Sequence, residues 1–120
     1  MERTIQAPLT IEDGLHKGVI VRVEERETKE KYHYIDVVIE FEDGKSIKQS
    51  FSDYLSQDSA LGKLMTRFGA DLTKVDGVIK LDNLISMTCQ FMTVKTGKYS
   101  NVVEDSLKPV DNVVRTNEEQ

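Results

Sequence analysis

One helical stretch constrains this chain more than any other feature, because the segments on both sides of it have the residue pattern of strands. The stretch is residues 58–71, DSALGKLMTRFGAD. Its apolar residues recur at the i, i+3, i+4 and i+7 spacing of one buried helix face, and they are Leu61, Leu64, Met65 and Phe68. Asp58 or Ser59 can cap its start, and Gly69 can end it because glycine adopts a positive φ without strain. We therefore predict one helix at about residues 58–69.

Three segments before this helix alternate apolar and polar residues with the two-residue period of strands. The first is residues 18–26, in which Val19, Val21 and Val23 would share one face, opposite Ile20. The second is residues 32–41, and the third is residues 46–51. The Asp-Gly pair at 43–44 favours a tight hairpin between the last two, because both residue types accept a positive φ. These segments predict a three-stranded meander.

Two further strand patterns follow the helix, at residues 87–95 and 99–103, with a turn at 95–98 between them. Pro109 ends the last segment, because proline cannot donate to a strand ladder. The order β-β-β-α-β-β predicts a mainly β protein with a five-stranded OB-fold barrel, whose open face commonly binds single strands or oligosaccharides. Another small β-barrel, such as an SH3-like one with an inserted helix, fits the same order. We expect residues 1–13 to be an N-terminal arm, residues 14–110 the domain, and residues 111–120 a polar, acidic tail.

The sequence contains little that would support catalysis. Cys89 is the only cysteine, so an internal disulfide and a cysteine-based zinc site are excluded, and we expect this thiol to be a small buried apolar group. The two histidines, His16 and His33, have no cysteine or carboxylate partner at ligand spacing. Asp36 and Glu40 share a strand face and could hold a hard cation, but such pairs are common on exposed strands. Phosphate-binding and hydrolase motifs are also missing from the sequence. We expect that the protein is not an enzyme and that it binds no metal and no cofactor.

Hydropathy and charge bear on location and partners. The chain has no apolar run near the roughly 20 residues that span a bilayer, and its start lacks a signal-peptide pattern. We therefore expect a cytoplasmic protein that does not associate with a membrane. The net charge is −5. Residues 1–44 hold 6 basic and 11 acidic residues, whereas residues 45–110 hold 9 basic and 7 acidic ones. The small basic excess therefore lies in the second half of the domain.

Several pieces, in this order, resemble a known family. They are GVIVRVEERE, YHYIDVVIEFEDGKSIKQSF, SALGKLMTRFG and MTCQFMTVKTGKYSNVVEDSLKPV, which together span roughly residues 14–110. Their pattern resembles small OB-fold single-stranded-DNA-binding-type proteins of phages and mobile elements, and the piece TGKYSNVVEDSLKP is the most characteristic. The resemblance implies non-catalytic binding of single-stranded DNA in replication or recombination.

Such binding needs aromatic rings on which bases stack and cations that follow the phosphates. The outward rings of the second strand and the second hairpin's lysines fit this need, as does the Lys95–Tyr99 turn. The candidate nucleic-acid-binding residues are Arg22, Tyr32, Tyr34, Lys45, Lys48, Tyr54, Lys95, Lys98 and Tyr99. Each also fits a plainer role, as a cross-strand packing residue or a solvated charge. Phe51 and Phe91 are better explained as core residues, and Lys63 and Arg67 as solvated helix charges.

The partners follow from these features. We expect single-stranded DNA as the ligand, and the sequence leaves RNA open. The acidic end, with Glu118 and Glu119, would recruit replication or recombination proteins, or it is a plain polar end. A homodimer is also left open. The alternative function is a protein-interaction adaptor on the same barrel, which the net charge and the acidic first half favour.

Overall fold

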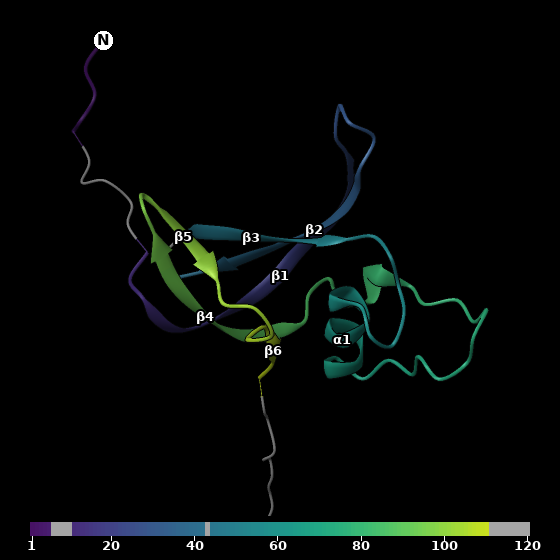
Figure 1. Ribbon diagram of the computed structural model, residues 1–120. Helices are drawn as coiled ribbons and strands as arrows, with labels where there is room; N and C mark the ends of the chain where they lie inside the picture. Colours follow the sequence, from purple (N-terminus) through teal and green to yellow (C-terminus); the bar gives the residue numbers. More distant parts are fainter. Residues whose placement is uncertain (6–10, 43, 111–120) are drawn as a thin grey trace, which may run out of the picture.

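The computed structural model describes residues 1–5, 11–42 and 44–110, and in this part the chain forms one antiparallel sheet with a single α-helix beside it (Figure 1). The elements are β1 Gly14–Glu27, β2 His33–Phe41, β3 Lys45–Ser52, α1 Ala60–Arg67, the 3₁₀ turn η1 Leu81–Leu84, β4 Thr88–Thr96, β5 Tyr99–Val102 and β6 Lys108–Pro109. The hydrogen-bonded order is β3-β2-β1-β4-β5, and β6 pairs with β4. A mainly β protein with one helix between its third and fourth strands is therefore confirmed.

The sheet is open at one seam. In the described part of the chain, no ladder joins β3 to β5, the two ends of the strand order. These two strands nevertheless contain Cα atoms within 8 Å of each other, so the sheet curls back toward itself. The short strand β6 was not predicted: Pro109 pairs with Cys89 at the edge of β4, where its missing N–H is tolerated.

A bulge in β1 divides the face that was predicted for the first strand. The pairing of β1 with β2 shifts register between Ile20 and Arg22, so that Val21 is an extra residue. Ile20 is consequently fully buried, whereas Val19 is exposed. The simple two-residue period predicted that Val19 and Val23 share one face, but the bulge exchanges inward and outward positions, so that Val23 packs against the core and Val19 does not. The first half of β1 pairs with β4 and the second half pairs with β2. β1 therefore joins the β2–β3 part of the sheet to the β4–β5 part.

The core lies between the curled sheet and α1. The two-residue period of residues 32–41 predicts an apolar face formed by Ile35, Val37, Ile39 and Phe41, and all four are buried. The helix residues Leu61, Leu64 and Met65 belong to the same core. Ser59 is the N-cap, and its Oγ accepts from the Gly62 N–H at 2.9 Å. The helix is two residues shorter at each end than predicted, since Ser59 caps it and Phe68 closes it. Gly69 follows with a φ of 96°, as expected of a helix stop.

Arg67 corrects one prediction about the helix. It was expected to be a solvated charge, but its Nε donates to the Leu107 carbonyl oxygen at 2.7 Å and its guanidinium lies 3.6 Å from Asp105. Leu107 itself is fully buried. Arg67 therefore ties α1 to the segment that leads into β6.

Some predictions lie wholly or partly outside the described residues. Asp43 of the predicted Asp-Gly turn is one of them, although Gly44 has the expected positive φ, at 84°. Residues 6–10 of the arm and the acidic tail, residues 111–120, are the others.

Candidate functional site

The second half of β1 together with β2 and β3 presents an outward surface that we call the polar face. Its main residues lie opposite one another in the strand register: Arg26 pairs with Tyr34, and Asp36 pairs with Ser50. Arg22 and Lys48 both lie opposite Val38, from the two sides of β2. The polar face is thus formed by Arg22, Glu24, Arg26, Tyr34, Asp36, Val38, Lys48 and Ser50.

Asp36 is the centre of this face. Its carboxylate accepts from Arg26 Nε at 2.8 Å, from Arg26 Nη2 at 3.2 Å and from Ser50 Oγ at 2.6 Å. Lys48 Nζ lies 3.7 Å away. The Asp36 side chain is only 5% exposed, so it is buried under the groups that it holds. A carboxylate with this many donors fixes the positions of the two cations.

The Arg26 guanidinium also covers one face of the Tyr34 ring, with its carbon 4.8 Å from the ring centroid. A cation at this distance is attracted by the ring's quadrupole. Tyr34 is half-buried, and a shallow depression of 250 Å³ lies beside it. The depression is lined by Glu25, Arg26, Glu27, His33, Tyr34 and Asp53.

These contacts shift the ionisation of both partners. The hydrogen bonds from Arg26 hold the pKa of Asp36 below its usual range, and they outweigh the opposing effect of burial. The same bond to Asp36 raises the pKa of Arg26. Both groups are therefore charged at neutral pH, and the pair is an ion pair.

We expect Asp36→Asn to lower the free energy of unfolding at neutral pH by about 1–3 kcal/mol, because it removes charge-assisted hydrogen bonds to Arg26. A lowered folded-state pKa contributes stability above the carboxyl's unfolded pKa, and this contribution is lost as the pH falls through the folded pKa. The difference between the two proteins should therefore shrink in acid. Urea unfolding at neutral and acidic pH measures it, with the exposed Asp53→Asn as control. An undiminished difference in acid would contradict this account.

The structure brings three of the predicted binding residues together on the polar face. These are Arg22, Tyr34 and Lys48, from three neighbouring strands. Arg22 also lies 3.5 Å from Glu24, so part of its charge is compensated. Tyr32, just before β2, is exposed in the β1–β2 hairpin, and its N–H donates to Thr28 Oγ1.

The β4–β5 hairpin holds Lys95, Lys98 and Tyr99 in a second place. Thr96 pairs with Tyr99 and Lys95 with Ser100, and the Tyr99 ring is 71% exposed. Within the described residues, Lys95 and Lys98 form no ion pair. Figure 1 shows this hairpin and the β1–β2 hairpin at opposite ends of the sheet. These predicted residues thus form two groups at different places in the sheet.

Two predicted binding residues lie apart from both groups. Tyr54 follows β3 and lines a groove of 640 Å³ with the loops 55–58 and 71–79, on the side of α1. Lys45 pairs with Phe41 in the ladder, and its Nζ lies 3.2 Å from the Glu42 carboxylate. Lys45 therefore belongs to a different polar network.

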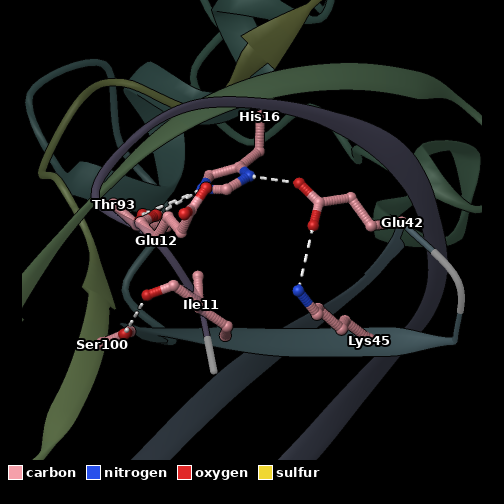
Figure 2. A network of polar contacts seen from close by, with 7 residues as sticks. All are labelled: Ile11, Glu12, His16, Glu42, Lys45, Thr93 and Ser100. Atoms are coloured by element: carbon pink, nitrogen blue, oxygen red, sulfur yellow. Dashed lines mark hydrogen bonds and ion pairs between the residues drawn. The ribbon is translucent and has the colours of Figure 1, made fainter. Parts of the chain in front are cut away.

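That network surrounds His16 and was not found from the sequence (Figure 2). His16 Nδ1 is 3.0 Å from Glu42 Oε1, and its Nε2 is 2.7 Å from the Glu12 carbonyl oxygen. The ring is buried against Phe41 and Phe91. These contacts join residues 11–13 to β1, β4 and the end of β2. The polar atoms of this network hydrogen-bond to one another. We therefore interpret the network as a structural contact that holds these strands together at one end of the sheet.

The sequence also failed to single out Arg26 and Ser50. The sequence shows only that Arg26 and Asp36 carry opposite charges on two predicted strands. Whether these side chains contact each other depends on the register of the β1–β2 hairpin. The suggested cation pair, Asp36 with Glu40, does not fit, because Asp36 is already bound by two cationic side chains. Among the described residues, no three metal-ligating side chains gather in one place. Cys89 is buried, and burial raises the pKa of its thiol to about 11.

The sequence matches no protein-family model, and the curated proteins include no significant match. In the described ranges, no helix has the length and apolar character needed to cross a membrane.

Proposed function

We propose that this sheet is an OB-type barrel that binds single-stranded DNA without chemistry, in support of replication or recombination. The fold proposal is supported by the approach of β3 to β5, since OB-folds are partly open barrels. In that fold, the face of strands two and three and the loops β1–β2 and β4–β5 hold the ligand. The polar face corresponds to the first of these regions, Tyr32 belongs to the β1–β2 loop, and Lys95–Tyr99 belongs to the β4–β5 loop.

The observation that carries the proposal is the arrangement around Tyr34. One face of its ring is covered by Arg26, which Asp36 holds in place. A base that stacks on a ring contributes about 1–3 kcal/mol, and a pre-positioned ring loses little freedom on binding. Lys48 lies 3.7 Å from Asp36, and both Lys48 and Arg22 are opposite Val38 further along the same face, where phosphates would follow the strand. Tyr99 with Lys98 would extend the path at the other end of the sheet.

Fluorescence anisotropy of a labelled oligo-dT of about 30 nucleotides tests the proposal. We expect salt-sensitive binding that Tyr34→Ala and Tyr99→Ala each weaken by about 1–3 kcal/mol. Lys48→Ala should lower the slope of log affinity against log salt by about 1. An oligo-rU of equal length decides whether RNA is bound too.

Two matched variants serve as controls. Tyr54→Ala removes a ring on the α1 side that is about as exposed as that of Tyr99, and Lys45→Ala removes a lysine already paired with Glu42. Both should bind like the unmodified protein. Absence of binding at low salt, or equal losses in Tyr54→Ala and Tyr34→Ala, would count against the proposal.

A protein-interaction adaptor is the second candidate function. It is favoured by the balance of charge on the outward side of these strands, where Glu24, Asp36 and Glu40 oppose Arg22, Arg26 and Lys48. The depression beside Tyr34 also contains three carboxylates, which repel phosphate. A pull-down with the purified chain distinguishes the two, since recovery of nucleic acid without protein would argue against an adaptor.

A further inference from the structure

The first half of β1 together with β4 and β5 presents a second outward surface, and its chemistry is different. Leu15 lies opposite Met92 in the ladder, and the Val103 N–H donates to the Met92 carbonyl oxygen at 2.8 Å. These three side chains therefore form one row across the strands. Val94 continues the apolar surface on one side of that row, whereas the row of Lys17 and Gln90 lies on the other side. We call the set Leu15, Met92, Val94 and Val103 the apolar face.

All four side chains are between 36% and 59% exposed. Single exposed apolar residues are ordinary on a protein surface, but a contiguous patch marks an interaction site. The polar face presents only Val38 among its outward residues as an apolar side chain, and that valine is buried. The apolar surface is therefore concentrated on one of the two outward surfaces of the sheet.

Charged side chains lie on both sides of the central row. Lys17 pairs with Gln90, and Gln90 pairs with Lys108, which makes a row with two lysines. On the opposite side, Asp13 accepts from the Lys95 N–H at 3.0 Å and lies beside Val94, which pairs with Asn101. The patch is thus basic along one border and acidic at one corner of the other.

We propose that the apolar face is the interface of a symmetric dimer of this chain. A two-fold axis along the Leu15–Met92–Val103 row sets each of these residues against its own copy. It also sets Lys17 of one copy against Asp13 of the other. An axis along the strands would instead oppose Lys17 and Lys108, and like charges in an interface cost several kcal/mol. The charge pattern therefore selects a second copy as occupant, and it selects one orientation.

The dimer does not depend on nucleic acid, and its test uses the full chain alone. Sedimentation velocity over a concentration series should show a monomer–dimer equilibrium. Val103→Glu places two carboxylates against each other on the axis and should raise the dimer dissociation constant about 100-fold or more. Val78→Glu is the matched control, because Val78 is exposed in the loop between α1 and η1. It should leave the constant unchanged.

A charge exchange tests the orientation. Lys17→Glu alone opposes carboxylates at two symmetric positions and should weaken the dimer about 10-fold. Added to Asp13→Lys, the same change should restore most of that loss, because the opposed pair is re-formed with its signs exchanged. A chain that stays monomeric throughout the series would overturn the proposal, as would equal effects of Val103→Glu and Val78→Glu. Dimers without the restoring effect would overturn the proposed axis.

Discussion

Gly62→Ala is expected to destabilise this protein by about 3 kcal/mol or more, although alanine is the better helix former. Gly62 is buried in the first turn of α1, and glycine inside a helix ordinarily costs about 1 kcal/mol relative to alanine. A Cβ at this position would overlap the carbonyl oxygen of Ser56 and would lie 3.1 Å from Leu72 Cδ2. The obstacle is backbone, which cannot turn aside as a flexible side chain does.

The clash would also disturb the start of the helix. Ser56 O accepts from the Ser59 N–H at 3.3 Å and from Ser59 Oγ at 3.1 Å, so moving it disturbs the residue that caps α1. Urea unfolding measures the loss, and Lys63→Ala in the same helix is the control, because Lys63 is exposed and should change little. A Gly62→Ala protein as stable as the unmodified chain would show that α1 does not pack against residue 56 this closely.

Phe91→Ala is expected to cost about 3–5 kcal/mol, the range for removal of a large core side chain. Phe91 is fully buried, and its ring centroid lies 5.6 Å from that of His16 and 5.2 Å from that of Phe41. Truncation leaves a cavity and removes the ring on which His16 stacks. The His16 network would then lack the ring that packs against it on one side.

Tyr99→Ala is the matched comparison for Phe91→Ala. It also replaces a ring by alanine, on the strand next to β4, but its side chain is exposed. We expect it to change the free energy of unfolding by less than about 0.5 kcal/mol. Chemical unfolding of both variants checks the contrast. Similar losses would mean that Tyr99 contributes to packing, and its proposed stacking role would then need reconsideration.

Local patterns predicted much of the fold. The helix, its cap at Ser59 and its stop at Gly69 follow from residues within a few positions of one another. The inward face of β2 follows from its two-residue period, and so does the core position of Phe91. The strand order along the chain was also readable. Whether the sheet closes into the predicted barrel was not readable, because closure depends on how far the sheet curls and not on any one segment.

Long-range pairing accounts for what the sequence did not reveal. The bulge at Val21 exchanges the faces of β1, and nothing in the apolar pattern of residues 18–26 marks it. Arg26 meets Asp36 only because of the hairpin register, and His16 meets Thr93 across 77 positions. Lys45 lies beside Glu42 and Tyr54 lines the groove near α1, so neither shares a surface with the other predicted binding residues. Helix and strand propensities and helix caps depend on residues within one turn or one strand, so the sequence alone is enough to predict them. Which side chains share a surface depends on register and curvature, and these are decided only when the strands pair.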